Sequence, residues 1–344
     1  LAITIANREK ALLQDLDYEN GYSLYVGIPF CPSICLYCSF GSHPLERWTK
    51  RVDEYLDTLC KELTFIREQM GARKLTTVYI GGGTPTTLEP EQLRRLLSHI
   101  QETFDFTWVK EYTVEAGRPD SITREKLQVM KEFPVTRISV NPQTMNQKTL
   151  DVIGRKHTVE DTVNIFHMAR ELEFDNINMD LIIGLPGEGK EEVAHTLQEV
   201  EKLHPDSLTI HSLALKRATR LNLFKDKYEE MSFENSKEIM EMTQQCAGNM
   251  GMGPYYLYRQ KNIAGNFENV GYAEVDKAGI YNILIMEEKQ TILAAGAGAS
   301  TKFVFEHGTR IERVENVKDV NNYILRIDEM LERKRVGIQK YLNG

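Results

Sequence analysis

Three closely spaced cysteines are the residues of this sequence best suited to carry chemistry. Cys31, Cys35 and Cys38 form a C-x3-C-x2-C run within residues 29–41, and Tyr37 stands directly before the third cysteine. Cysteine thiolates hold iron–sulfur clusters, and a cubane [4Fe–4S] cluster contains four irons. Three thiolates can bind three of those irons and leave the fourth open to a ligand that is not protein. The spacing therefore predicts a loop that binds a [4Fe–4S] cluster.

Other uses of cysteine fit the sequence less well. Structural zinc normally takes four ligands in two pairs, and the sequence has no second C-x2-C pair. A disulfide framework is typical of short secreted chains with an even number of cysteines, whereas this chain has five in 344 residues. Together with the remaining Cys60 and Cys246, the run predicts a reducing, cytoplasmic location.

Composition narrows the classes of partner. The chain is 41% hydrophobic and 27% charged, which is ordinary for a soluble globular protein. Its net charge of −8 argues against a broad surface for nucleic acid or anionic membrane. No apolar run is long enough to span a bilayer, and no signal peptide is visible. We therefore expect neither a nucleic-acid partner nor a membrane span.

A repeated strand–helix pattern must position the cysteine loop. Six apolar, β-prone segments alternate with amphipathic helical segments, and near-continuous apolar strands of this kind predict a parallel sheet. A closed eight-unit barrel takes about 250 residues, which is more than this stretch offers. We therefore predict an α/β fold with an open, partial (βα)6 barrel. The six strands are expected at residues 22–28, 76–80, 112–116, 135–140, 177–183 and 207–214.

The pattern divides the chain into three parts. Residues 1–20 form a lead-in, residues 21–215 form the barrel, and residues 216–344 form a C-terminal α+β extension that covers the substrate. Within the extension we expect strands at residues 283–286 and 291–295.

Polar side chains and glycines follow several of the predicted strands. Gly82 and Gly83 follow the second strand, Glu115 ends the third, Gln143 follows the fourth and Asp180 lies near the end of the fifth. Ligands of parallel α/β barrels bind at these carboxyl ends, so the dispersed residues are expected to converge. Glycine lets the backbone approach a ligand that a Cβ would block.

The cysteine spacing and Tyr37 resemble the cluster-binding motif of the radical S-adenosylmethionine (SAM) enzymes. Further stretches resemble the oxygen-independent coproporphyrinogen III oxidases over about residues 20–330, and within them the HemZ-type branch. The stretches shared with the wider family are Tyr25-x-x-Ile28-Pro29-Phe30-Cys31, Gly82-Gly83-Thr84-Pro85, Val114-Glu115, Gln143, Arg155 and Asp180-Leu181-Ile182-x-Gly184-Leu185-Pro186. Those typical of the branch are Cys38-Ser39-Phe40, Tyr112-Thr113-Val114-Glu115-Ala116-Gly117-Arg118 and Gly265-Asn266-Phe267-Glu268-Asn269.

The resemblance implies two cofactors and their binding residues. Cys31, Cys35 and Cys38 would hold the cluster, and Tyr25 would lie beside cluster and SAM as a catalytic-site residue. The glycine loop would hold the SAM amino group, and Glu115 and Arg155 would supply partners of both signs. The SAM-binding residues implied in this way are Tyr25, Tyr37, Gly82, Gly83, Thr84, Glu115, Gln143, Arg155, Asp180, Ala214 and Ser300.

The resemblance also implies a reaction. The reduced cluster would cleave SAM, and the resulting radical would take a hydrogen from a porphyrinogen propionate. Loss of CO2 and one electron would leave a vinyl group, and two rounds would convert coproporphyrinogen III to protoporphyrinogen IX. An electron donor such as flavodoxin or ferredoxin would be needed. The chain departs from the HemN-type enzymes at Phe40, where they carry a further cysteine, and at Ser300, where they carry an aliphatic residue.

The segment from Tyr255 to Tyr272 is rich in aromatic and basic residues at its start and offers a place for a tetrapyrrole. Aromatic faces and cations suit a macrocycle with four propionates. The alternative is a surface hairpin with solvated charges. The substrate-binding residues predicted here are Tyr256, Tyr258, Arg259 and Lys261.

Two other functions compete with decarboxylation. A haem chaperone resembling the HemW-type members would keep the cluster motif, but their His-Asn pair is Tyr281-Asn282 in this chain, which argues against their haem site. An enzyme that modifies or degrades haem by methyl transfer and ring opening is the third possibility. The sequence does not separate it from the oxidase.

Overall fold

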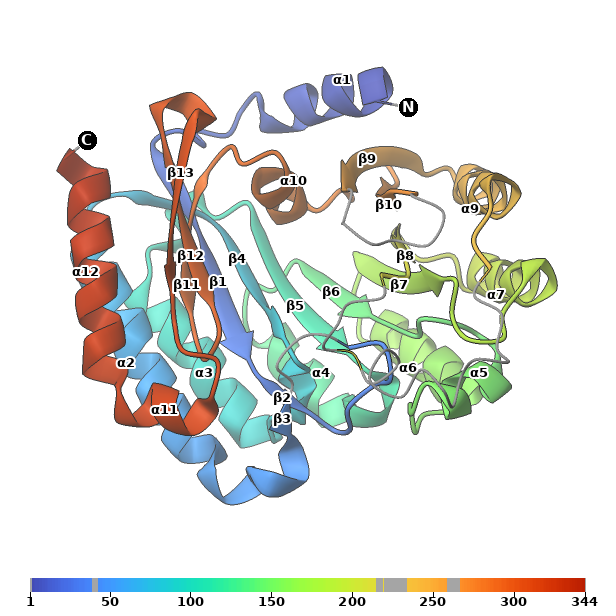
Figure 1. Cartoon of the computed structure of the whole chain (residues 1–344), viewed down its shortest axis with the longest axis horizontal. Coiled ribbons are helices and arrows are strands. Elements are labelled where there is room, and N and C mark those ends of the chain that lie inside the picture. Colours follow the sequence, from blue (N-terminus) through green and yellow to red (C-terminus); the bar gives the residue numbers. More distant parts are fainter. Residues whose placement is uncertain (1, 39–42, 215–218, 220–233, 259–266, 344) are drawn as a thin grey trace.

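The computed structural model describes residues 2–38, 43–214, 219, 234–258 and 267–343. Within them, eleven strands form one sheet (Figure 1). Neighbouring strands at its centre all run parallel. In spatial order these are β11 (Thr291–Ala295), β1 (Gly21–Ile28), β4 (Lys74–Gly82), β5 (Glu111–Gly117), β6 (Arg137–Val140), β7 (Ile177–Ile183) and β8 (Ser207–Ser212).

The predicted α/β fold with a parallel sheet is confirmed. Strands β1, β4, β5, β6, β7 and β8 are the six predicted strands, with bounds that differ by a few residues at most. Strand β11 adds a further parallel strand from the C-terminal region, in register with β1 from Tyr22↔Thr291 to Val26↔Ala295. The sheet therefore takes one of its parallel strands from the far end of the chain.

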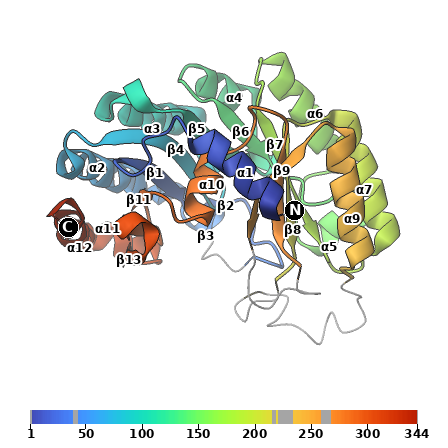
Figure 2. The same cartoon turned by 90° about the horizontal axis from the view of Figure 1, so that it is seen from above.

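Amphipathic helices cover the outer face of the sheet, as Figure 2 shows by the arc that they form around the strands. Helix α2, for example, buries Tyr55, Leu59, Leu63 and Ile66 on one stripe. Each such side chain contributes about 1.5–3 kcal/mol when it is fully buried. The covering helices are α2 (Val52–Met70), α3 (Pro90–Thr103), α4 (Arg124–Lys131), α6 (Val159–Glu171) and α7 (Lys190–Leu203). Leu150 of the short helix α5 (Gln147–Val152) belongs to a separate apolar cluster with Leu36 of the cysteine loop.

The inner face of the parallel strands is polar, so the expectation of near-continuous apolar strands is wrong for this face. In β7, Met179 and Leu181 belong to the hydrophobic core, whereas Asn178 and Asp180 alternate with them and hydrogen-bond to each other at 2.7 Å. Asn178 also accepts hydrogen bonds from Ser207 at 3.0 Å and Thr209 at 3.2 Å. The alternation arises because one face packs against helices and the other surrounds the interior of an open barrel.

The C-terminal region extends both sides of the sheet. Strands β12 (Ser300–Phe305) and β13 (Arg310–Glu315) continue antiparallel beyond β11, and β10 (Asn269–Ala273) and β9 (Gly253–Tyr258) continue beyond β8. The prediction that this region covers the substrate stays a prediction.

The strand expected at residues 283–286 is wrong, because this segment lies in helix α10 (Ile280–Met286). A short apolar run does not distinguish strand from helix by its pattern alone. The first backbone amides of α10 donate to the Glu111 carboxylate, Ile280 at 2.6 Å and Tyr281 at 3.2 Å. A carboxylate satisfies the free amides of a helix start and its positive dipole. Helix α10 therefore closes the amino end of the parallel strands, opposite β2 (Phe30–Cys31) and β3 (His43–Pro44) (Figure 1).

The remaining helices pack around this framework. Helix α1 (Ala2–Leu13) lies against β9, and Arg8 donates to the Gly253 carbonyl at 2.6 Å. Helix α9 (Lys237–Asn249) packs on α7, and α11 (Val320–Leu325) and α12 (Ile327–Asn343) pack on α2. Within the described residues, no helix combines the length and apolar composition that crossing a bilayer requires.

A buried charge pair joins α12 to α2. Lys334 Nζ donates to Glu62 Oε1 at 2.7 Å, and both side chains are 0% exposed. Glu62 also accepts from the Tyr323 hydroxyl at 2.6 Å, Asn316 Nδ2 at 2.8 Å and the Gly296 amide at 2.9 Å. One carboxylate thus holds the turn after β11, the C-terminal helices and α2 together.

Lys334→Met should lower the free energy of unfolding by about 3–5 kcal/mol, because the Glu62 carboxylate would stay buried without its cation. Urea denaturation followed by circular dichroism measures the change. Lys61→Met is the matched control, since Lys61 pairs with Asp328 at 2.7 Å on the surface. That control should cost less than about 1 kcal/mol. Equal losses in the two variants would contradict the prediction.

Candidate active site at the carboxyl ends of the parallel strands

The cysteine loop begins where β1 ends. Cys35 is buried, and Cys31 and Cys38 are partly exposed. Among the described residues, no three Cys, His, Asp or Glu side chains are arranged to hold a single metal ion. A cubane cluster makes a different demand, because each of its irons takes its own thiolate.

The glycine loop after β4 holds the start of the cysteine loop. The Gly83 amide donates to the Ile28 carbonyl at 2.7 Å, and the Thr84 amide donates to the Phe30 carbonyl at 2.8 Å. A Cβ on Gly83 would lie 2.6 Å from the Phe30 carbonyl oxygen, which is closer than real Cβ contacts come. Thr84 Oγ1 also donates to Cys31 Sγ at 3.6 Å. Close backbone approach was predicted here toward a ligand, and at Gly83 it serves the chain's own backbone.

A second segment holds the middle of the cysteine loop. The Leu36 amide donates to the Ile153 carbonyl at 2.9 Å, and Ser33 Oγ donates to the Gly154 carbonyl at 3.0 Å. Arg155 Nη2 donates to the Tyr37 hydroxyl at 3.1 Å. The predicted residues Tyr37 and Arg155 are therefore neighbours.

Arg155 has an N–H donor that forms no hydrogen bond with the described residues. Its side chain is buried, and Nη1 donates to the Asn141 carbonyl at 2.6 Å. Arg155 Nε is buried without a hydrogen-bond partner among the described residues. A guanidinium carries five N–H donors, so the bonds to Asn141 and Tyr37 leave donors for another group.

Gln143 sits beside Asp180 in an unusual backbone conformation. Its φ of 69° is left-handed, which costs a residue other than glycine about 1–3 kcal/mol. The Gln143 amide donates to the Asp180 carbonyl at 3.0 Å, and the Gln143 carbonyl accepts from the Ile182 amide at 3.0 Å. Its side-chain Oε1 is buried with no partner among the described residues. These bonds bring the ends of the fourth and fifth predicted strands together.

The pKa values of the two acids Glu115 and Asp180 are shifted in opposite directions. Desolvation by the surrounding protein raises the pKa of Glu115 to about 7, although the Tyr79 hydroxyl donates to this carboxylate. Burial also opposes ionisation of Asp180, but bonds from His211 and Asn178 outweigh it and lower the Asp180 pKa. Near neutral pH, Glu115 is poised to titrate and Asp180 is a carboxylate.

Tyr25 lies beneath the glycine loop. Its ring stacks on Tyr79 with centroids 6.2 Å apart, and Tyr79 stacks on Tyr281 at 4.5 Å. A Cβ on Gly82, whose φ is +107°, would lie 3.2 Å from the Tyr25 hydroxyl oxygen. The aromatic stack thus joins the predicted site to helix α10.

The remaining predicted residues differ in exposure, and two of them lie outside the described part. Ala214 is partly exposed just beyond β8, and Ser300 is exposed at the start of β12. Tyr256 is buried against Gly271, whereas Tyr258 is exposed. Arg259 and Lys261 lie outside the described residues.

Arg118 is a residue beside the cysteine loop to which the sequence analysis assigned no role, although it ends one of the stretches typical of the HemZ-type branch. It follows β5 directly, is buried, and Nη1 donates to the Ser33 carbonyl at 2.9 Å and to Cys35 Sγ at 3.6 Å. The available signals were its place just after a predicted strand and its place in that stretch. Its approach to a cysteine 83 positions away is visible only in the fold.

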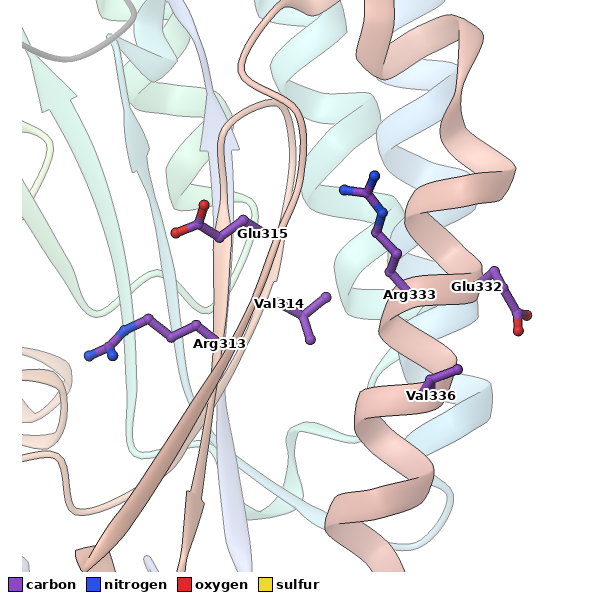
Figure 3. Close-up of a pocket in the computed structure, with 6 residues that line it drawn as sticks. All are labelled: Arg313, Val314, Glu315, Glu332, Arg333 and Val336. Carbon is purple, nitrogen blue, oxygen red and sulfur yellow. The ribbon is translucent and has the colours of Figure 1, made fainter.

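A groove of about 730 Å³ lies elsewhere, between β13 and α12 (Figure 3). None of the predicted site residues lines it. Its lining residues are Arg313, Val314, Glu315, Glu332, Arg333 and Val336.

Comparisons with known proteins identify the family to which the chain belongs. A model of the radical SAM superfamily matches residues 25–200, the stretch that holds the cysteine loop and strands β1 through β7. The coproporphyrinogen III oxidase HemN of Escherichia coli, described as a radical SAM enzyme, has a similar solved structure with a TM-score of 0.72 and 25% identity. That match covers 94% of this chain and 73% of the HemN chain.

Two curated relatives come from Bacillus subtilis. The chain is 44% identical over 334 residues to the oxygen-independent coproporphyrinogen-III oxidase-like protein HemZ, covering 96% of this chain and 67% of HemZ. It is 37% identical over 198 residues to the heme chaperone HemW, covering 57% of this chain and 52% of HemW. The chain thus spans about two thirds of HemZ and half of HemW. Matches of this extent confirm the resemblance: the chain belongs to the radical SAM superfamily, as an oxidoreductase whose cofactors are a [4Fe–4S] cluster and SAM.

Proposed function

We propose that this protein oxidatively decarboxylates two propionates of coproporphyrinogen III without oxygen and so forms protoporphyrinogen IX. The observation that carries the proposal is the 44% identity to HemZ over 96% of the chain. The HemN structure, which matches over 94% of the chain, supports the same reaction. The chain spans 67% of HemZ and 73% of the HemN chain, so we propose their activity for it.

Cys31, Cys35 and Cys38 are proposed to hold the cluster. The loop that carries them is held by the glycine loop on one side and by the segment from Ile153 to Arg155 on the other. Burial raises the pKa of Cys31 to about 11, while the bond from Thr84 lowers it. Iron would favour the thiolates directly, as a bound metal does for any coordinating thiol.

The SAM molecule is proposed to bind at the carboxyl ends of β4 to β8. Buried polar atoms in native proteins are nearly always hydrogen-bonded, so the unpartnered Gln143 Oε1 and Arg155 Nε fit a ligand that supplies their partners. Arg155 suits the SAM carboxylate, Glu115 its ammonium group and Asp180 a ribose hydroxyl. The full proposed set is Tyr25, Tyr37, Gly82, Gly83, Thr84, Glu115, Gln143, Arg155, Asp180, Ala214 and Ser300.

When bound, the two cofactors supply the one-electron chemistry that removes a hydrogen atom from a propionate side chain. The chain's own residues bind, orient and shield. The stacked Tyr25, Tyr79 and Tyr281 are proposed to shield the reacting groups from water. The tetrapyrrole is proposed to contact Tyr258 together with Tyr256, Arg259 and Lys261. A flavodoxin or ferredoxin is the proposed electron donor.

A haem chaperone is the second candidate, favoured by the match to HemW. The position of Tyr281 weighs against it. Tyr281 is buried and stacks on Tyr79. Its helix, α10, lies at the end of the sheet opposite β2 and β3 (Figure 1). Tyr281 is therefore not presented to the surface as a haem ligand.

An anaerobic turnover assay tests the proposed reaction. The reconstituted protein is mixed with dithionite, SAM and coproporphyrinogen III, and tetrapyrroles and 5′-deoxyadenosine are measured by mass spectrometry. We expect loss of two CO2 per tetrapyrrole with matching deoxyadenosine. Deoxyadenosine without loss of coproporphyrinogen would overturn the proposed substrate, and haem would then be tested as substrate and as ligand. Absence of SAM cleavage in cluster-loaded protein would overturn the decarboxylase proposal altogether.

Gly83→Ala should reduce the iron bound per chain after reconstitution, because its Cβ would meet the Phe30 carbonyl oxygen at 2.6 Å and push the start of the cysteine loop away. Iron and acid-labile sulfide assays measure the loss. Gly248→Ala is the matched control, since a Cβ there meets no atom within 4 Å. Wild-type iron content in Gly83→Ala would show that the close approach of the two loops is not needed to hold the cluster.

SAM should bind more weakly as pH falls through about 7, because Glu115 must lose its proton to pair with the SAM ammonium group. A single group with this pKa predicts about a fivefold rise in Kd from pH 7 to pH 6. Calorimetry with the cluster kept oxidised measures binding without SAM cleavage. Glu115→Gln should remove the pH dependence over this range. The same slope in wild type and variant would exclude Glu115 as the titrating group.

A further inference from the structure

Beside the cysteine loop, the buried Arg118 forms an ion pair with Asp120, whose side chain is 16% exposed. Arg118 is 4% exposed, and its Nε and Nη2 donate to the two Asp120 carboxylate oxygens at 3.0 and 2.7 Å. This fork leaves Nη1 for the cysteine loop, where it meets the Ser33 carbonyl and hydroxyl at 2.9 Å each and Cys35 Sγ at 3.6 Å. One guanidinium therefore touches a carboxylate on one side and a cysteine sulfur on the other.

The turn after β5 fixes both members of the pair. Gly117 has a φ of +74°, and a short 3-10 helix, η5 (Pro119–Ser121), follows Arg118. The Ser121 amide donates to the Arg118 carbonyl at 3.0 Å. Removing the Arg118 guanidinium from water costs several kcal/mol, so this buried cation needs close compensation. Here the carboxylate fork and the loop contacts supply it.

Such a pair has a defined effect on a neighbouring iron–sulfur cluster. Hydrogen bonds to the sulfurs and net charge near a cluster set its reduction potential. A donor to Cys35 Sγ and a positive charge both stabilise the cluster after it gains an electron. The Asp120 carboxylate opposes this, because it offsets the positive charge of Arg118.

We infer that Arg118 is a positioning residue that raises the reduction potential of the cluster, and that Asp120 limits this rise. The step concerned is the gain of one electron by the [4Fe–4S]²⁺ cluster, which becomes [4Fe–4S]⁺, from an external one-electron reductant. The inference rests on the proposal that Cys35 is a cluster ligand. It does not depend on which tetrapyrrole, if any, the protein converts.

The test is a redox titration of the reconstituted full chain, with dithionite as reductant and electron paramagnetic resonance as readout, without SAM or tetrapyrrole. In Arg118→Met we expect the equilibrium constant for one-electron reduction to fall about tenfold, a shift of about 59 mV to more negative potential. In Asp120→Asn we expect a shift in the opposite direction, because the cation loses its counter-charge. Arg118→Lys should lie between Arg118→Met and wild type.

Arg124→Met is the matched control, because Arg124 pairs with Glu171 on the surface and should leave the potential unchanged. If the pair had only a structural role, Arg118→Met and Asp120→Asn would both lose iron or stability. Their reduction potentials would then not shift in opposite directions. Unchanged potentials in Asp120→Asn and Arg118→Lys, or shifts of the same sign in Asp120→Asn and Arg118→Met, would overturn the inference.

Further outcomes distinguish a failure of this inference from a failure of the proposed cluster ligands or of the proposed reaction. If Arg118→Met folds but retains no iron, the titrations of Asp120→Asn and Arg118→Lys still decide the electrostatic effect. If Cys35→Ser binds as much cluster as wild type, the proposed ligand set fails and the inference fails with it. A failed turnover assay with coproporphyrinogen III would leave all of these potentials measurable.

Discussion

The backbone hydrogen bonds between the glycine loop and the start of the cysteine loop are the contact on which the rest of the site depends. The amides of Gly83 and Thr84 reach the carbonyls of Ile28 and Phe30, and the missing Cβ of Gly83 makes this approach possible. Strands β1 and β4 are parallel neighbours, so their carboxyl ends already lie together. The hydrogen bonds between the two loops then fix the relative positions of the residues proposed to bind the cluster and SAM.

The polar inner face of the sheet is the second organising feature. A parallel sheet covered by helices on both faces can be apolar throughout, but an open barrel must line its interior with side chains that suit a polar ligand. Asn178, Asp180 and Thr209 satisfy one another across β7 and β8, and Tyr79 satisfies Glu115 across β4 and β5. The interior is therefore organised by the protein itself, and only Gln143 Oε1 and Arg155 Nε among the proposed SAM-binding side chains are buried without partners in the described part.

Most of the features that could be predicted follow from local sequence patterns. The six parallel strands are apolar segments bounded by clear breaks, and the cysteine run has a spacing that few other sites share. The helix at α10 could not be predicted because Ile280–Met286 is too short and too apolar to show a period. The pairing of β11 with β1, the left-handed Gln143 and the contact of Arg118 with Cys35 depend on residues far apart in sequence or on backbone angles. Composition and spacing do not report these.

An open sheet, unlike a closed barrel, leaves two outer strands whose unpaired backbone groups can recruit strands from other molecules. The order of the sheet makes β13 and β9 these outer strands. Strand β13 carries Arg310, Glu312 and Arg313, and β9 contains Pro254, which has no backbone amide to offer. Charges and proline are the means by which natural sheets discourage such recruitment. The partial barrel therefore carries its own protection against growing by strand addition into an aggregate.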